Sequence, residues 1–274
     1  MAALFNRKSN PDEMSFLQHL EALRWHLVRS VVAVCVLAVV AFFNKALLFD
    51  GIILAPKKSS FITYRFFCWL ARKVEVDFCI SEIPFSLQST ELSKQFTLHM
   101  WVAFVAGFIL AAPYIFWELW QFFKPALSPK ERKYTTGVVF FTSLLFLTGV
   151  FFGYFVIAPL SINFLGTYTV SDQVQNIFTL DSFISIIVFM TLASGIVFEL
   201  PIVIYFLSKI GIVTPAFLRA YRRHAIVIIL IIAAVITPSP DVTSQMLVAV
   251  PLYLLFEISI LISNFVYNQQ SKEQ

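Results

Sequence analysis

Charged residues are scarce in this chain. Asp, Glu, Lys and Arg make up 13% of its 274 residues, against about 25% in an ordinary soluble protein. Hydrophobic residues make up 59%, so the composition excludes a soluble globular protein of this length. The chain also has only 8 glycines and no linker rich in Ser and Gly. We therefore expect a single integral membrane domain over residues 1–274.

Motifs that bind cofactors or metals are missing as well. The four histidines and three cysteines lack the spacing of metal ligands. There is no GxxxxGK or GxGxxG phosphate-binding loop and no GxSxG nucleophile elbow. We therefore expect no enzyme, no cofactor and no metal. The net charge of +4 is dispersed over separate loops, which argues against a nucleic-acid-binding protein.

Long apolar segments dominate what the sequence does contain. A helix needs about 20 apolar residues to cross a hydrocarbon core of about 30 Å. The fifth segment falls short of this length, and we expect the last two helices to be short. The pattern predicts an all-α integral membrane protein with six transmembrane helices. Five of the segments cover about residues 27–43, 96–117, 182–208, 225–237 and 242–263, and the third in chain order lies within residues 135–171.

Loop charges predict the orientation of these helices. Residues 124–133 and 209–223 each hold four Lys or Arg, whereas the third-to-fourth and fifth-to-sixth loops hold none. Cytoplasmic loops collect Lys and Arg, so both chain termini are expected in the cytoplasm. Residues 1–26 are then a cytoplasmic amphipathic segment, residues 264–274 a cytoplasmic tail, and residues 44–95 an extracytoplasmic cap. The aromatic content of the cap predicts short amphipathic helices at the outer face of the membrane.

The cap contains two of the three cysteines, Cys68 and Cys79. Its predicted compartment is oxidising, where disulfides form and persist. A Cys68–Cys79 disulfide and a pair of free thiols are both open at this point.

An acidic residue, Glu199, interrupts the fourth apolar segment. A charge near the bilayer centre costs at least about 2.5–3.5 kcal/mol, so Glu199 must face protein or water, or be protonated. Pro201 frees the carbonyl of Val197 and is expected to bend the helix. Two interpretations stay open: a protonated Glu bonded to a neighbouring helix, or a polar cavity used by a substrate or partner.

Other polar residues lie near the ends of the predicted helices. Thr237, Asp241 and Gln245 surround the turn TPSPD on the outer side. They either cap the helices at this turn or form a partner site. Glu118 and Glu257 lie near inner helix ends, where placement at the membrane interface accounts for them.

The inner loop WELWQFFKPALSPKERK, residues 117–133, carries a lone acid in its basic turn, Glu131. Pro125 and Pro129 end the preceding helix and stiffen the turn. A carboxylate displayed there is suited to docking a cationic partner. Glu21, on the amphipathic N-terminal segment, is a candidate for a second acid at the same membrane face.

Together these segments resemble TatC, the receptor subunit family of the twin-arginine protein export system. The likeness covers nearly the whole chain, and several motifs occur in the family's order. These motifs are FLQHLEALR (16–24), PYIFWELWQFFKPALSPKER (113–132), GYFVIAPL (153–160), FELP (198–201) and TPSPDVTSQ (237–245).

The resemblance implies a cupped, concave six-helix fold that binds signal peptides bearing an arginine pair. It also implies single-span partners, TatA and TatB, self-association in a larger complex, and transport driven by the proton-motive force. By resemblance, Glu131 receives an arginine, and Phe122 and Pro125 belong to the same recognition surface. The family usually has Glu directly before the Leu-Arg pair, where this chain has Ala22, and Glu21 is the nearest acid.

The resemblance also assigns the intramembrane polar residues. Glu199 matches the buried acid of the family's fourth helix, and Thr237 and Gln245 match polar positions that contact a partner helix. The principal alternative is a proton-coupled secondary transporter of a small solute, with Glu199 as the coupling acid. A structural subunit of a larger membrane assembly is a second alternative.

Overall fold

The computed structural model describes residues 16–58, 60–73, 86–123, 135–171, 173, 176–237 and 242–270. Its main helices are α1 (Phe16–Phe43), α2 (Ile62–Lys73), α3 (Lys94–Phe123), α5 (Thr135–Phe152), α6 (Ala158–Thr167), α7 (Leu180–Val197), α8 (Leu200–Lys209), α9 (Pro215–Ala220), α10 (Arg222–Ile236) and α11 (Val242–Gln270). Shorter elements are η1 (Leu47–Ile53), η2 (Ala55–Lys57), η4 (Gly153–Ile157), β1 (Ser86–Gln88) and β2 (Ile177–Thr179).

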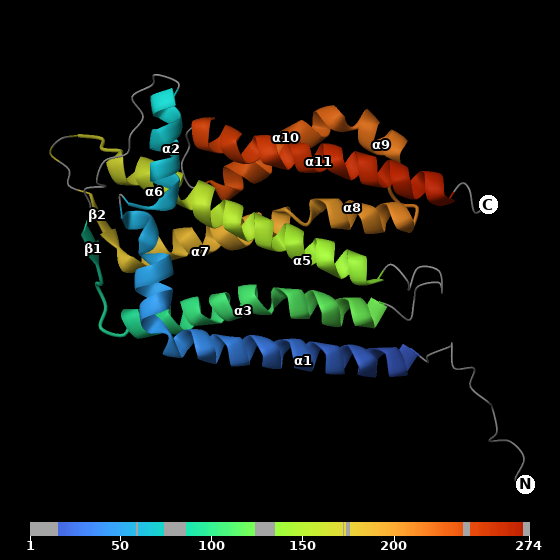
Figure 1. Ribbon diagram of the computed structural model, residues 1–274, viewed down its shortest axis with the longest axis horizontal. Coiled ribbons are helices and arrows are strands. Elements are labelled where there is room, and N and C mark those ends of the chain that lie inside the picture. The colour runs from blue at the N-terminus through green and yellow to red at the C-terminus, as the bar shows by residue number, and fades with distance from the viewer. Residues whose placement is uncertain are drawn as a thin grey trace, which may run out of the picture.

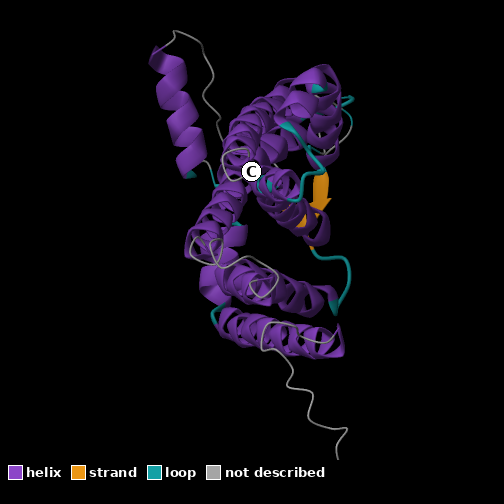
Figure 2. Cartoon of the chain, turned by 90° about the vertical axis from the view of Figure 1, so that its right-hand side faces the viewer, coloured by secondary structure: helices purple, strands orange, loops and turns teal. Residues whose placement is uncertain are grey.

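The long helices run side by side, with the start of α1 and the end of α11 at the same end (Figure 1). We call this the inner end, after the predicted orientation, and the opposite end, where α2, β1 and β2 lie, the outer end. Helix α1 packs on α3, α3 on α5, and α5 on α7, while α11 packs on α8 and α10. Seen with the inner end facing the viewer, the helices form an open, curved row with α1 and α3 at its bottom (Figure 2).

The N-terminal amphipathic segment and the first apolar segment form one continuous helix, α1. The sequence from Phe16 to Phe43 contains neither Pro nor Gly, so no residue in it breaks the backbone ladder. The predicted boundary near residue 26, between the amphipathic segment and the first span, is therefore not a break in the backbone. It is a change in side-chain polarity along one helix.

The third and fourth spans are both interrupted, whereas the sequence predicted a bend only in the fourth, at Pro201. A π-helical stretch, η4, separates α5 from α6, and Pro159 lies in the first turn of α6. Helix α7 ends at Val197, and Pro201 lies in the first turn of α8. Proline lacks the N–H of an interior helical residue and is tolerated in a first turn, so each break lies where the helix can restart.

Five spans in the described part of the chain are long and apolar enough to cross a membrane: residues 21–43, 94–122, 137–167, 180–209 and 244–269. The fifth predicted span corresponds to α10, which has 15 residues. At about 1.5 Å per residue it is about 22 Å long, shorter than a hydrocarbon core of about 30 Å. The count of six transmembrane helices therefore stays a prediction.

The expectation of a short sixth helix is corrected. Helix α11 has 29 residues and contains Pro251 in its interior. The prediction followed only the apolar run that ends near Ser263, whereas the helical backbone continues through polar residues to Gln270.

Two short strands were not foreseen. Strands β1 and β2 pair in parallel at the outer end, with Leu87 opposite Phe178. They join the first predicted outer loop to the segment that precedes α7. An ion pair of 3.5 Å between Lys94 Nζ and Asp181 Oδ2 lies close by in sequence, at the starts of α3 and α7. These contacts tie α3 to α7 in addition to their packing.

The cap helix α2, predicted as a short amphipathic helix, is fastened to the outer end by polar and aromatic contacts. Thr63 Oγ1 donates a hydrogen bond to the Phe155 carbonyl. Tyr64 Oη lies 2.8 Å from the Pro56 carbonyl oxygen and 3.1 Å from that of Pro159. Burial raises the pKa of the Tyr64 phenol above its ordinary value, so this hydroxyl stays a donor.

Helices α5 and α7 approach each other closely at a glycine. A Cβ added at Gly149 would lie 2.6 Å from the Ser194 backbone oxygen, whereas one added at Gly137 would meet nothing within 4 Å. Only a residue without a side chain allows this approach, which explains Gly149 in the interior of a helix.

We predict that Gly149→Ala destabilises the protein, because the new methyl group forces α5 and α7 apart. The expected cost is roughly 1–3 kcal/mol. Gly137→Ala is the matched control and should be neutral or stabilising by up to about 1 kcal/mol. Thermal unfolding of both variants in detergent measures the difference. Equal midpoints for the two variants would contradict the close packing.

Candidate functional site

The structure brings two of the predicted recognition residues to the inner end. Glu21 is exposed near the start of α1, and Phe122 is half-buried near the end of α3. Since α1 and α3 pack against each other, these residues belong to neighbouring helices at one end of the row. Pro125 and Glu131 lie outside the described residues.

Beside this end, α1 and α3 are joined by a polar network. Glu118 is only 5% exposed. Its Oε2 lies 2.5 Å from Nδ1 of His26, and its Oε1 accepts a hydrogen bond of 2.6 Å from the Tyr114 hydroxyl. Both carboxylate oxygens therefore have partners, which offsets the cost of burying the group.

This network corrects the expectation that Glu118 is simply an interfacial residue. Its partner, His26, is 92 positions away in the sequence, so no local pattern reveals the pair. Tyr114 precedes Glu118 by four positions on the same helix, and that spacing is a usable signal for a side-chain contact.

A second polar network joins α10 to α11 at the inner end. Arg222 Nη2 lies 2.7 Å from Oε2 of Glu257, and the Tyr253 hydroxyl donates to the other carboxylate oxygen at 2.9 Å. Glu257, which the sequence placed at an interface, thus holds one helix to another. The arrangement repeats that of Glu118: a tyrosine four residues earlier and a basic partner on a neighbouring helix.

Glu199 occupies the turn between α7 and α8. Both of its carboxyl oxygens are buried, and among the described residues neither makes a hydrogen bond of normal geometry. The buried hydroxyls of Thr191 and Ser194, on the preceding turns of α7, likewise have no hydrogen-bond partner among the described residues. The described side chains thus supply no partner on a neighbouring helix, and the role of Glu199 stays a prediction.

At the outer turn between α10 and α11, two of the predicted residues make hydrogen bonds within the chain. Thr237 is buried, and its hydroxyl donates to the Ala233 carbonyl at 2.9 Å. Gln245 Nε2 donates to the Leu230 carbonyl at 3.0 Å and so links α11 to α10. Asp241 lies outside the described residues. These bonds are roles within the chain, and contact with a partner stays a prediction.

The cysteines are placed in part. Cys68, on α2, takes part in a disulfide bond, whereas Cys35, on α1, is free and exposed. Cys79 lies outside the described residues, so the Cys68–Cys79 pairing stays a prediction. The described part of the chain holds no cluster of three or more His, Cys, Asp or Glu that could hold a metal ion.

Comparison with known proteins identifies the family. Residues 18–251 match the family model of the Sec-independent protein translocase protein TatC. The TatC of Blattabacterium sp. subsp. Periplaneta americana is 42% identical over 262 residues, which cover 94% of this chain and 98% of the relative. That of Carboxydothermus hydrogenoformans is 32% identical and covers 92% of this chain and 94% of its own length.

The fold agrees with this match. A crystal structure of the twin-arginine translocase receptor TatC superimposes with a TM-score of 0.67 and 30% identity, covering 91% of this chain and 99% of the other. A second one, in the detergent DDM, gives a TM-score of 0.68 and 31% identity, covering 89% and 99%. The chain therefore belongs to the TatC family and is a multi-pass inner-membrane component of the Sec-independent, twin-arginine protein transport system.

Proposed function

We propose that this chain is the membrane receptor for signal peptides that carry an arginine pair, and that it binds them at its inner end. One observation carries the proposal: Glu21 is exposed on α1 at the end of the row where α3 carries Phe122. Pro125 and Glu131 follow Phe122 by three and nine residues along the chain. Membership in the TatC family supports the same surface.

The chemistry of this surface favours arginine over lysine. A guanidinium pairs with a carboxylate through two parallel hydrogen bonds, whereas an ammonium acts as a point charge. One exposed ion pair contributes only about 0–1 kcal/mol, so a single acid does not hold a peptide. Two acids at a partly desolvated membrane face, together with burial of the apolar part of the signal, supply the rest.

The network of His26, Glu118 and Tyr114 lies next to this surface and stabilises it. It joins α1 to α3 five residues beyond Glu21 and four residues before Phe122. We assign it the role of holding the two helix ends in register, so that Glu21 keeps its position relative to the loop that follows α3. Glu118 and His26 are positioning residues in this proposal.

The outer halves of α10 and α11 are proposed to receive the single-span partners TatA and TatB. Helix α10 is short, and its outer-half side chains Ile231 and Val235 are more than half exposed. A partner helix there would lie beside Thr237 and Gln245, with Asp241 in the adjoining turn. Glu199 would contribute a polar group to the interior during transport driven by the proton-motive force.

The first prediction of the receptor proposal concerns the two acids. The double variant Glu21→Gln/Glu131→Gln should lower signal-peptide affinity roughly 10- to 100-fold, because hydrogen bonds to charged groups contribute about 1.5–3 kcal/mol. In single variants, Glu131→Ala should reduce export more than Glu131→Asp does. Photocrosslinking to an arginine-pair signal, with a lysine-pair signal as control, measures binding.

Unchanged crosslinking and export by the double variant would refute the receptor proposal. Proton-coupled uptake of a small solute by vesicles that contain only this chain would instead support the transporter alternative.

The second prediction concerns Glu118. Glu118→Leu removes the partner of both His26 and Tyr114 and should destabilise the protein by roughly 1–3 kcal/mol, with weaker signal-peptide crosslinking at a temperature where the variant is folded. Glu118→Gln keeps groups that bond to both partners and should restore crosslinking.

Glu257→Leu is the matched control, because it breaks the similar network between α10 and α11. It should lower thermal stability without lowering signal-peptide crosslinking. Equal loss of crosslinking in both leucine variants would show that general destabilisation, and not the placement of α1 and α3, is responsible.

A further inference from the structure

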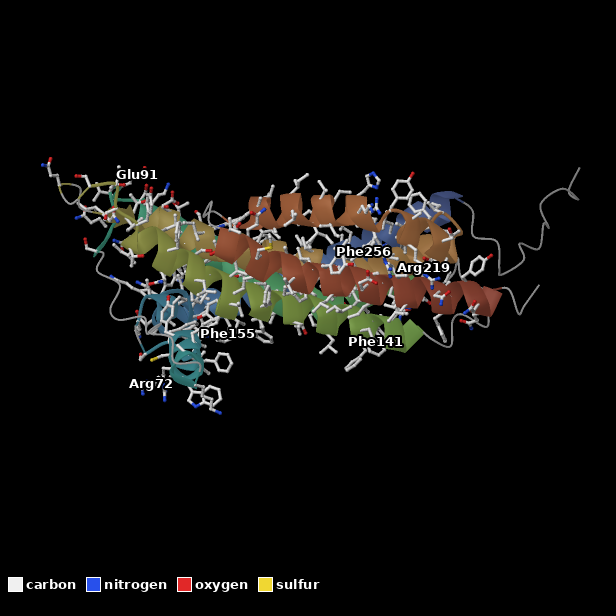
Figure 3. The ribbon with its side chains drawn as sticks, turned by 90° about the horizontal axis from the view of Figure 1, so that it is seen from above. Arg72, Glu91, Phe141, Phe155, Arg219 and Phe256 are labelled. Atoms are coloured by element: carbon white, nitrogen blue, oxygen red, sulfur yellow. The ribbon has the colours of Figure 1, made fainter. Side chains whose placement is uncertain are left out.

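Helix α2 runs across the direction of the long helices and projects beyond the row at the outer end (Figures 1 and 2). Figure 3 labels Arg72 on the part of α2 that lies outside the row. Because the long helices span the membrane, a helix across their ends lies along the plane of the membrane. Its bonds through Thr63 and Tyr64 fix that direction.

The face of α2 turned away from the protein is apolar and aromatic. Ile62, Phe66 and Trp69 are 65%, 56% and 53% exposed. Their spacing of four and three residues puts them on one side of the helix. Tyr64 and Ala71, which are buried, are seven residues apart and form the opposite side. The apolar stripe is thus the exposed side of an amphipathic helix, and the opposite side packs against the protein.

All charges on α2 are positive. The helix contains three basic residues, Arg65, Arg72 and Lys73, all exposed, and no Asp or Glu. Arg65 and Arg72 are seven residues apart and lie along one edge of the apolar stripe. Lys73 Nζ lies over the Trp69 ring, 4.4 Å from its centre. A cationic edge beside an aromatic stripe is the pattern of helices that lie in a membrane interface.

We propose that α2 is a lipid-binding helix that inserts Ile62, Phe66 and Trp69 among the acyl chains of the outer leaflet and binds the phosphates of anionic phospholipids through Arg65, Arg72 and Lys73. Tryptophan prefers the headgroup level, and long basic side chains reach from apolar surroundings to the headgroups. The proposal rests on the membrane-spanning fold and does not depend on signal-peptide binding.

Charge complementarity favours anionic lipid over a protein partner. Each Lys or Arg close to an anionic membrane surface strengthens binding about five-fold, and α2 contains three of them and no acid within its own residues. The exposed ring of Phe151, on α5, contacts Phe155, which stacks on Phe61 just before α2. Ring contacts therefore connect the outer surface of α5 to the residue that precedes α2.

The test uses the full chain with Trp69 as its only tryptophan, the other four (Trp25, Trp101, Trp117 and Trp120) being replaced by Phe. It is reconstituted in vesicles of phosphatidylcholine with brominated acyl chains, with or without phosphatidylglycerol. We expect the brominated lipid to quench Trp69, and phosphatidylglycerol to increase the quenching. The variant Arg65→Gln/Arg72→Gln/Lys73→Gln should lose that increase. A chain that keeps only Trp101, an exposed residue of α3, is the control and should be quenched equally in both lipid mixtures.

Two results would overturn the proposal. Quenching of Trp69 by aqueous iodide and not by brominated lipid would show that the apolar stripe faces water, and would favour a protein partner as its ligand. Equal quenching with and without phosphatidylglycerol, while the three basic residues are intact, would remove the role of the anionic headgroup.

A second measurement avoids multiple tryptophan replacements. A photoreactive benzoylphenylalanine at Phe66, in the otherwise unchanged chain, should crosslink to phosphatidylglycerol in preference to phosphatidylcholine. The same group at Phe104, an exposed residue of α3, should crosslink to both lipids without preference. Crosslinks from position 66 to protein alone would overturn the proposal.

Discussion

The absence of water from the bilayer interior is the constraint on which this structure depends. Backbone polar groups in hydrocarbon must be bonded within the chain, which leaves helices as the form for each span. Charged side chains are expensive there, so they collect at the helix ends. The broken spans obey the same rule: the turn at Phe198 and Glu199 packs on α5, where the buried ring of Phe198 contacts Phe152.

Polar groups within the row fall into two kinds. Glu118 and Glu257 have complete sets of partners that join α1 to α3 and α10 to α11. Glu199, Thr191 and Ser194 are buried without side-chain partners in the described part of the chain. The paired carboxylates of the first kind stabilise contacts between helices. The unpaired groups of the second kind carry a free-energy cost of desolvation that a structural role alone does not offset. That difference is why Glu199 is assigned to transport in the proposed function.

Much of the architecture was predictable because it depends on local composition. The apolar runs identified the spans, and Pro201 identified the break in the fourth span, since a proline acts on its own helix. The amphipathic cap helix also followed from the aromatic content of the first outer loop. The strand pairing of Leu87 with Phe178 and the length of α11 were missed. A three-residue strand carries almost no pattern, and a helix continues into polar residues once its apolar part is packed.

The sequence by itself determined the membrane class, the family and the residue types offered for recognition, because hydropathy, loop charge and motif order are all readable along the chain. Only the tertiary structure decided which of these residues meet. His26 and Glu118 are 92 positions apart, and the close approach at Gly149 depends on the backbone of another helix. The side of α2 that faces away from the protein was likewise settled by the contacts of Tyr64. Contacts between distant segments follow from how whole helices pack, and no local pattern encodes that packing.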